Sequence, residues 1–464
     1  MSLKLYNTLT NNIDEFKEIN KGKVGLYMCG PTVYDHAHIG NFRSNIFQDI
    51  VKRYLIYLGY KVKHVMNITD IDDKTIKKSI EQSIPIEEVT KKYTDSFFED
   101  LNTLNILKAD VYPKATEHIP DMKSMISTLI DKDFAYKKGD SVYFNIEKFD
   151  NYGKLANIQK ENLQTGISVD KDEYDKNNVQ DFVLWKGKKE NEPFWKTIFG
   201  EGRPGWHIEC SAMSTKYLGE HFDIHIGGVD LIFPHHENEI AQSECTTNKK
   251  FVNYWLHCQH LIVDNKKMSK SLKNFYTLKD LLKKGYEPME IRYLLISAHY
   301  RKLLNFTFEG LVSAGKSLKR INEFLFILKG LKPQSGKNDD IINIINEYEL
   351  KFKESMDDDI NIAGALGTLF EFIHSINKKL DILKREDIKE ILLFIERINS
   401  VLGILQDEAE KNINDERIEK LIEERTKARN EKNFSLADKI RNELKENGII
   451  LIDTPDGVRW KIEK

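Results

Sequence analysis

The first seventy residues contain two short apolar runs separated by one amphipathic stretch, and this order of elements limits the fold more than any other feature. Lys23 to Met28 predicts a strand, the periodicity from Asn41 to Leu58 predicts a helix with a broad apolar face, and Lys61 to Ile68 predicts a second strand. A strand, a helix and a strand in succession imply a parallel sheet. Ligands of such sheets bind at the carboxyl ends of the strands.

The rest of the chain predicts a second half of this domain and then a mostly helical region. Residues 111–199 are rich in lysine and lack long periodic runs, which is typical of an insertion between two halves of one domain. The predicted elements that follow are a strand at Phe222–Ile226, a helix at Phe233–Glu244, a strand at Trp255–Val263, long amphipathic helical stretches at Phe308–Leu331 and Gly364–Leu405, a charged helix at Ile418–Glu446 and a hairpin of Ile449–Ile452 with Val458–Ile462. The fold class is therefore α/β: a Rossmann-like parallel-sheet domain with an insertion, followed by a helical bundle and a small mixed C-terminal domain.

Size and charge exclude several classes of protein. A chain of 464 residues exceeds what one hydrophobic core organises, and its 70 basic and 73 acidic residues give a net charge of −3, so any nucleic-acid surface must be a local patch. No apolar run reaches membrane-spanning length, and the amino-terminal residues lack the apolar core of a signal peptide. The cysteines are too few and too scattered for a disulfide framework, which favours a cytoplasmic protein with free thiols; they are Cys29, Cys210, Cys245 and Cys258.

Two segments match nucleotide-binding patterns without the elements that those patterns need. Gly310 to Ser317 has the letters of a phosphate-binding loop, but helical spacing of apolar residues continues straight through it. Gly200 to Gly205 has the letters of a dinucleotide fingerprint, but Pro204 blocks the helix that the fingerprint must open. We expect neither to bind a nucleotide.

Two other segments suit the phosphates of a nucleotide better. Tyr34 to Asn41 lies where the first strand meets its helix; His38 can donate a hydrogen bond there, and Gly40 leaves room for close approach. Lys267 to Ser271 offers lysines and hydroxyls on a loop after a strand. Taken singly, an exposed turn histidine and a lysine-rich surface loop explain these residues equally well or better.

Together, His38-Ile39-Gly40-Asn41 and Lys267-Met268-Ser269-Lys270-Ser271 resemble the paired signature sequences of class I aminoacyl-tRNA synthetases. The surrounding segments narrow this resemblance to the cysteinyl-tRNA synthetase family; they are Met28–Asp35, Gly202–Met213 and Gly227–Glu239, with Phe434–Ile440 and Leu451–Gly457 in the tail. The resemblance covers essentially the whole chain. Asn41 departs from the broader class, which often has histidine there, although asparagine still donates a hydrogen bond.

A metal site is expected from residues far apart in the sequence. Cys29, Cys210 and a histidine–glutamate pair supply ligands that zinc accepts, although a buried cysteine alone is more often a packing residue. His235 and Glu239 are four apart on a predicted helix and share a face. The residues alone also allow His236; the family pattern selects His235. A zinc protease is disfavoured because Ile240 occupies the position of its second histidine.

The resemblance implies a ligase that activates L-cysteine with ATP and transfers it from cysteinyl-adenylate to the 3′ terminal ribose of tRNA(Cys). It implies one Zn2+ per chain that selects the cysteine thiolate, Mg2+ with ATP, and a monomer without a membrane partner. The implied site residues are catalytic His38, Lys267 and Lys270, ATP-binding His38, Gly40, Asn41, Lys267, Ser269 and Lys270, substrate-binding Trp206 and Asp230, and metal-binding Cys29, Cys210, His235 and Glu239.

The resemblance also assigns parts of the chain to domains. These are 1–110 and 200–264 (catalytic halves), 111–199 (insertion), 265–307 (signature loop and stem-contact region), 308–405 (tRNA-binding bundle) and 406–464 (anticodon recognition). Arg425, Lys427, Arg429 and Lys432 suit RNA phosphates, although the interleaved glutamates also fit a solvated helix face. Two alternatives remain: a ligase that joins cysteine to an amino sugar, and a non-catalytic RNA-binding protein on the same scaffold.

Overall fold

The computed structural model forms two compact units. It describes residues 2–158, 163–167, 179–269, 272, 274–405, 415–446, 449–454 and 457–462. Unit 1 comprises residues 1–318, 347–371 and 396–404, and unit 2 comprises residues 319–346, 372–395 and 405–464.

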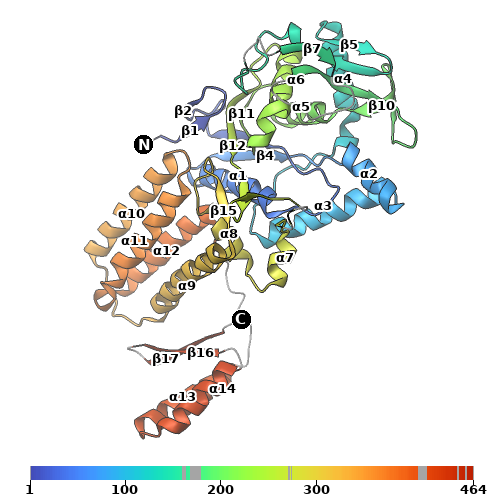
Figure 1. Ribbon diagram of the computed structural model, residues 1–464. Helices are drawn as coiled ribbons and strands as arrows, with labels where there is room; N and C mark the ends of the chain where they lie inside the picture. The colour runs from blue at the N-terminus through green and yellow to red at the C-terminus, as the bar shows by residue number, and fades with distance from the viewer. Residues whose placement is uncertain are drawn as a thin grey trace. The chain divides into compact units, whose positions relative to one another are not determined.

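A four-stranded parallel sheet is the central element of unit 1 (Figure 1). Its strands, in spatial order, are β12 (Val252–Cys258), β11 (Phe222–Gly228), β3 (Lys23–Met28) and β4 (Lys61–Met66). Helix α1 (Ile39–Tyr57) joins β3 to β4, so the strand, helix and strand predicted from the first seventy residues are confirmed. Apolar residues are buried along both the strands and the helix. The strand–helix–strand arrangement is therefore the core of an α/β fold.

The strand order places a topological switch between β3 and β11. The chain leaves β3 toward β4 on one side, and it leaves β11 toward β12 on the other side. Met28 at the end of β3 pairs with Ile226 of β11, so the carboxyl ends of the two strands lie together. Cys29, which follows β3, and Gly227, near the end of β11, therefore meet at the position where open parallel sheets bind ligands.

The insertion and residues 200–204 after it form a second, mainly antiparallel sheet. Its strands are β5 (Ala135–Lys138), β6 (Ser141–Phe144), β8 (Val179–Gly187), β10 (Gly200–Pro204) and β9 (Trp195–Thr197), with β7 (Leu163–Ile167) pairing with β8. Helices α4 (Ile119–Asp131), α5 (Trp206–Leu218) and α6 (Glu237–Thr247) lie beside this sheet in Figure 1. Phe144 and Phe182 of the sheet share one core with Met122, Met213 and Ala241 of these helices.

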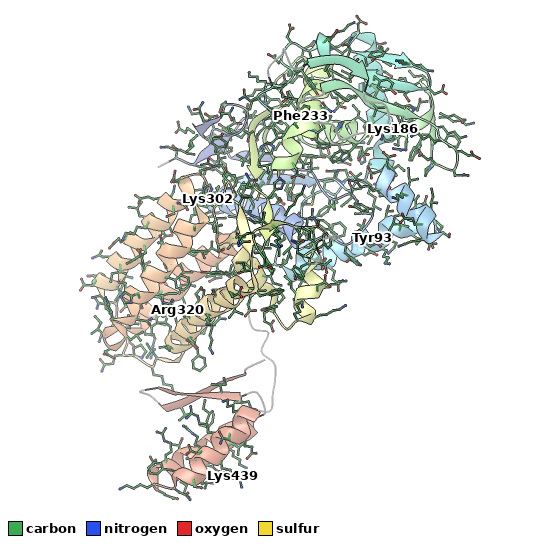
Figure 2. The ribbon with its side chains drawn as sticks, in the orientation of Figure 1. Tyr93, Lys186, Phe233, Lys302, Arg320 and Lys439 are labelled. Atoms are coloured by element: carbon green, nitrogen blue, oxygen red, sulfur yellow. The ribbon has the colours of Figure 1, made fainter. Side chains whose placement is uncertain are left out.

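The two rejected nucleotide motifs lie in regular structure. Gly310 to Ser317 lies inside α9 (Phe308–Gly330), as its periodicity predicts. Gly200 to Pro204 is strand β10, and a Cβ at Gly202 would lie only 2.1 Å from the carbonyl oxygen of Lys186, which Figure 2 labels on the neighbouring strand. Close strand packing explains that glycine.

One strand prediction was wrong. The run Trp255–Val263 is divided into β12 and β13 (Leu261–Val263), which belong to different sheets. The chain leaves the first sheet at Gln259, whose backbone N–H donates to the carbonyl oxygen of Tyr300. The next carbonyl, that of His260, accepts a hydrogen bond from the buried Arg43 guanidinium of α1.

Two long stretches that were each predicted to be helical are each divided into two helices. The stretch Gly364–Leu405 divides into α11 (Ile362–Asn377) and α12 (Arg385–Leu402), because the buried Asp387 carboxylate accepts from the backbone N–H of Lys384 and caps a new helix start. The stretch Ile418–Glu446 divides into α13 (Asp415–Asn430) and α14 (Phe434–Glu446). Lys432 has a left-handed φ of 56°, and the Asn433 side chain accepts from the N–H of Leu436.

The remaining described α-helices and strands complete the two units. They are β1 (Lys4–Asn7), β2 (Asn12–Glu15), α2 (Asp73–Gln82), α3 (Ile86–Thr103), β14 (Lys266–Lys267), α7 (Leu278–Lys283), α8 (Pro288–Ile296), β15 (Leu304–Phe306), α10 (Asp339–Asp357), β16 (Ile449–Thr454) and β17 (Gly457–Ile462). The strands β16 and β17 form the predicted hairpin. Among the described residues, no helix combines the length and the apolar character needed to span a membrane.

A buried charge cluster ties α1 of unit 1 to three other segments. The Asp49 carboxylate accepts from Arg53 at 2.8 Å and from Arg292 of α8 at 2.6 Å, and all three side chains are nearly inaccessible to solvent. Arg292 also donates to the carbonyl oxygens of Leu104 and Leu402, which end α3 and α12. The two guanidinium groups therefore satisfy helix-end carbonyls that would otherwise be buried without a partner.

We predict that Asp49→Asn destabilises the protein by about 3–5 kcal/mol, because it leaves two buried guanidinium groups without their anion. Denaturant unfolding measures the loss. Asp95→Asn is the matched control: Asp95 pairs with Lys91 at 2.6 Å, but both side chains are more than half exposed, so the expected change is below about 1 kcal/mol. Equal effects of the two substitutions would contradict this assignment.

Candidate metal centre and active site

Three separate segments bring potential metal ligands to the carboxyl ends of β3 and β11. Cys29 directly follows β3, and Cys210 lies in α5, which starts after the insertion sheet. His235 and Glu239 come from the segment after β11, where a wide helical turn (Ile232–His236) continues into α6. Phe233, labelled in Figure 2, has extended backbone angles inside that turn, which separates it from the preceding short helix Val229–Leu231.

These side chains form one compact cluster. Ligand atoms of Cys29, Cys210, His235 and Glu239 all lie within 4.8 Å of one another. The two sulfurs are 3.7 Å apart, Cys29 Sγ is 3.5 Å from Glu239 Oε1, and His235 Nε2 is 3.1 Å from the same oxygen. The structure thus brings together the residues that the sequence and the family pattern select for a metal.

A second set of donors overlaps the first. Cys29 and Glu239 also group with His225 and His236 within the same distance. His236 Nε2 is 3.5 Å from Cys29 Sγ, so the alternative that the sequence left open is geometrically possible. The set with Cys210 contains two sulfurs and the other contains one, and sulfur is the ligand that soft-metal sites prefer.

Further histidines support the cluster, and sequence reasoning missed them. His225 Nε2 lies 3.0 Å from Glu239 Oε2, and the Nδ1 atoms of His207 and His235 are 2.9 Å apart. His236 Nδ1 lies 2.8 Å from Nε2 of His257. These contacts fix the orientation of the side chains that carry the ligand atoms. A histidine inside the apolar strand run Phe222–Ile226 was the signal available in the sequence.

The electrostatics of the cluster favour a bound cation. Burial would raise the pKa of Cys210, but the hydrogen bond from Cys29 lowers it to about 6. Burial would likewise raise the pKa of Glu239, but neighbouring His225 lowers it to about 2. Burial would lower the pKa of His235, but the negative charge of Cys210 raises it to about 10. Two anionic groups therefore share this buried space with one cationic imidazole, which leaves a net negative charge that a bound cation can balance.

The donor set also fits a metal at the level of individual atoms. His235 Nε2 is buried and makes no hydrogen bond of good geometry within the part of the chain that the structure describes, although Glu239 is close. A buried ring nitrogen without such a bond is costly unless it has another partner. Cysteine, histidine and glutamate are all ligand types that zinc accepts. The residues present therefore fit a coordinated metal ion.

The two signature segments lie side by side in unit 1. His38 caps α1: its Nδ1 accepts from the backbone N–H of Asn41, and the Asn41 side chain accepts from the N–H of His38. A Cβ at Gly40 would lie 3.0 Å from the His38 ring and 3.1 Å from Cε of Met268. The His38 ring also contacts Phe275, with centroids 5.1 Å apart. The start of α1 and the second signature loop thus form one surface.

The described part of the second signature loop is held by one asparagine. Asn274 accepts from the backbone N–H of Ser269 at 2.8 Å and donates to the carbonyl oxygen of Lys267 at 3.1 Å. Lys267 lies in the exposed strand β14, so its ammonium group is available at the surface. Lys270 and Ser271 lie outside the described residues.

The two predicted substrate contacts have different surroundings. Trp206 is the first residue of α5, and its ring centroid is 4.1 Å from that of His235, directly beside the cluster. Asp230 is exposed just after β11, and its Oδ1 lies against Gly228, where an added Cβ would be 2.3 Å away. Of the other cysteines, Cys245 and Cys258 are buried outside both donor sets.

Comparison with known proteins agrees with the sequence motifs. Residues 15–316 match the family described as tRNA synthetases class I (C) catalytic domain, and residues 351–406 match the DALR domain. A Brachyspira hyodysenteriae protein named cysteine–tRNA ligase is 52% identical over 467 residues, which cover 98% of each chain. A protein of the same name from Chlamydia felis is 49% identical, over 99% of this chain and 98% of the relative.

The solved structures share the fold at much lower identity. Mycobacterium tuberculosis methionyl-tRNA synthetase in complex with methionyl-adenylate superposes with a TM-score of 0.60 at 12% identity, over 82% of this chain and 90% of the other. This likeness supports the α/β fold class and its parallel sheet. By its full-length similarity to cysteine–tRNA ligases, the chain belongs to that family of class I aminoacyl-tRNA synthetases.

Proposed function

We propose that this protein uses ATP to activate L-cysteine as cysteinyl-adenylate and then transfers the cysteinyl group to the 3′ terminal ribose of tRNA(Cys). The observation that carries the proposal is the buried cluster of Cys29, Cys210, His235 and Glu239 at the topological switch of the parallel sheet. The names of the relatives and the adjacent signature segments support the same reaction.

We assign one zinc ion per chain to this cluster. Cysteine and serine differ by one sulfur in place of oxygen, and the shape of a pocket rejects such a close analogue only weakly. When bound by these ligands, zinc supplies a position at which a thiol loses its proton and binds through sulfur, as a serine hydroxyl does far less readily. Cys29, Cys210, His235 and Glu239 hold the ion, and Trp206 beside His235 forms a wall for the amino acid. Asp230 is the assigned partner of the substrate ammonium group.

Activation of cysteine requires in-line attack of its carboxylate on the α-phosphorus of ATP, with release of pyrophosphate. His38 and Asn41 contact the phosphates at the start of α1, where backbone N–H groups favour an anion, and Gly40 permits close approach. Lys267, Ser269 and Lys270 stabilise the charge that develops on pyrophosphate, and Mg2+ accompanies the nucleotide. A Cβ added at Gly40 would lie 3.1 Å from Cε of Met268, and this close approach of the two segments supports their joint role.

We assign tRNA binding to the helical bundle (308–405) and to the tail (406–464). The DALR match at residues 351–406 supports a role for the bundle. In α13 and the turn after it, Lys427, Arg429 and Lys432 are exposed and suit RNA phosphates, whereas Arg425 is buried and is better explained by packing. Phe434 is 61% exposed beside these cations, an arrangement that suits an unpaired base. We further propose a cytoplasmic monomer with the domain boundaries given above.

Two assays separate this function from its rivals. Cysteine-dependent exchange between ATP and pyrophosphate would exclude a non-catalytic RNA-binding protein. Attachment of cysteine to tRNA(Cys) without consumption of an amino sugar would exclude a ligase that joins cysteine to such a sugar. The DALR match favours the tRNA ligase, since a ligase for a small sugar has no use for such a region.

We predict that Cys210→Ser lowers the affinity for zinc by at least about 100-fold, because it removes one of two sulfur ligands. Metal analysis and competition with a chelator measure the loss. Cys245→Ser removes a buried sulfur outside the cluster and should keep one zinc per chain. Full zinc retention by the Cys210 variant would contradict the assigned ligand set.

We predict that Lys270→Ala slows cysteine-dependent pyrophosphate exchange by about 100- to 1,000-fold, as expected for loss of one charge-stabilising group. Its zinc content should stay unchanged, because the lysine is not among the assigned ligands. Lys266→Ala, a change at a neighbouring exposed lysine, is the control and should leave the exchange rate within about twofold. Wild-type exchange by the Lys270 variant would remove its assigned role.

We predict that truncation after Leu405 separates the two half-reactions. Pyrophosphate exchange should remain within about twofold, because the cluster and both signature segments belong to unit 1. The kcat/KM for tRNA charging should fall by about 100-fold or more, because several cationic contacts are lost. An equal loss in both assays would show that the tail supports folding and has no specific role toward tRNA.

A further inference from the structure

Asn274 is a polar residue beside the second signature segment, and none of the steps above gives it a role. Its side chain bonds twice to the backbone of that segment. The Oδ1 atom accepts from the N–H of Ser269 at 2.8 Å, and Nδ2 donates to the carbonyl oxygen of Lys267 at 3.1 Å. A side-chain amide accepts and donates side by side, as the backbone of a neighbouring strand does. One side chain therefore spans residues 267–269 as a strand partner would.

The residues that follow in the chain bond to the first signature segment. The N–H of Ile39 donates to the carbonyl oxygen of Tyr276 at 3.0 Å, and His38 forms an isolated antiparallel bridge with Thr277. The ring of Phe275 also meets the His38 ring edge-on, with centroids 5.1 Å apart. These contacts fix residues 275–277 relative to the start of α1.

A helix start holds the same backbone from its other side. Thr277 caps α7: its hydroxyl oxygen accepts from the N–H of Asp280 at 3.2 Å, and the Asp280 carboxylate accepts from the N–H of Thr277 at 2.9 Å. Such a capping box fixes the chain where the helix begins. Asn274 therefore extends from an anchored backbone and relates residues 267–269 to the start of α1.

We propose that Asn274 is a positioning residue for the reaction of ATP, because its two hydrogen bonds align Lys267 and its neighbours with the phosphate-binding start of α1. The proposed function, on which this inference rests, assigns the phosphates to one signature segment and the charge developing on pyrophosphate to the other. Groups on two separate segments stabilise one transition state only when the spacing between the segments is fixed. The bonds of Asn274 fix that spacing.

The test is Asn274→Ala in the full chain, which removes both bonds and leaves the backbone contacts of Tyr276 and Thr277 in place. The kcat of cysteine-dependent pyrophosphate exchange should fall by about 10- to 100-fold, the order of loss expected when a charge-stabilising group is misplaced. The KM for cysteine should stay within about twofold, because the amino acid is bound by other residues. An unchanged kcat, or a KM for cysteine that rises as much as kcat falls, would overturn the inference.

Asn305→Ala is the matched control. The Oδ1 atom of Asn305 accepts from the N–H of Asn265 at 2.8 Å, so this asparagine also joins its side chain to the backbone of the β13–β14 hairpin. Its bond lies at the turn of the hairpin, before Lys267, and kcat should stay within about twofold. A loss equal to that of Asn274→Ala would show that the integrity of the hairpin controls the rate, and the proposed role of Asn274 would be wrong.

A double-mutant cycle with Lys267→Ala separates positioning from a general structural effect. Because Asn274 acts through the segment that carries Lys267, the double variant should be at least about threefold faster than the product of the two single losses. Losses that multiply would show independent roles and would contradict the inference.

The proposed function and the inference fail in different proteins. Absence of cysteine-dependent exchange in the wild-type protein would remove the function and, with it, the inference. Exchange by the wild-type protein together with full activity of the Asn274 variant would remove only the inference.

Discussion

The parallel pairing of β3 with β11 is the constraint on which the site depends. The two strands belong to different halves of the domain, and the register of Met28 with Ile226 determines which residues meet at their ends. Because side chains alternate along a strand, a slip of one residue would turn Tyr27 and His225 to the other face of the sheet. It would also carry Cys29 away from the segment that contributes His235 and Glu239. The chemistry of the cluster is therefore a consequence of sheet register.

Buried charge is arranged on the same principle in two parts of unit 1. In the cluster around Asp49, one carboxylate balances guanidinium groups that also satisfy carbonyl oxygens at helix ends. At the candidate metal centre, anionic sulfur and carboxylate groups face His235 and His236, whose Nδ1 atoms lie within hydrogen-bond distance of His207 and His257. The first arrangement is complete within the protein, which suits a structural role. The second has buried atoms without a good hydrogen bond, which suits a ligand.

Much of this was predictable from the sequence, for identifiable reasons. The strands and helix of the first seventy residues follow from local periodicity, and α9 follows from apolar spacing that ignores the phosphate-loop letters. The family motifs selected four ligands, and the structure brings them together; they are Cys29, Cys210, His235 and Glu239. The roles of Lys270, Trp206 and Asp230 stay predictions.

What the sequence did not reveal depends on contacts between distant residues. The apolar pattern of Trp255–Val263 continues through Gln259, but Arg43 and Tyr300 bind the backbone there and divide the strand. In the sequence, the three supporting histidines, His207, His225 and His257, are far apart. Only the fold brings them to the cluster. The last long helical stretch is divided at Lys432, which has a left-handed backbone conformation. Lysine rarely adopts this conformation, so its presence in the sequence did not predict the break.

The core that the insertion shares with α5 and α6 affects how this enzyme family can vary. Met213 of α5 and Ala241 of α6 pack against Phe144 and Phe182 of the insertion sheet, and the same helices carry Cys210 and Glu239. The inserted segment is thus the packing support of the ligand-bearing helices and cannot be exchanged as a detachable module. Changes in its length should be tolerated at the hairpin turns, whereas shortening its strands would loosen the helices that carry Cys210 and Glu239.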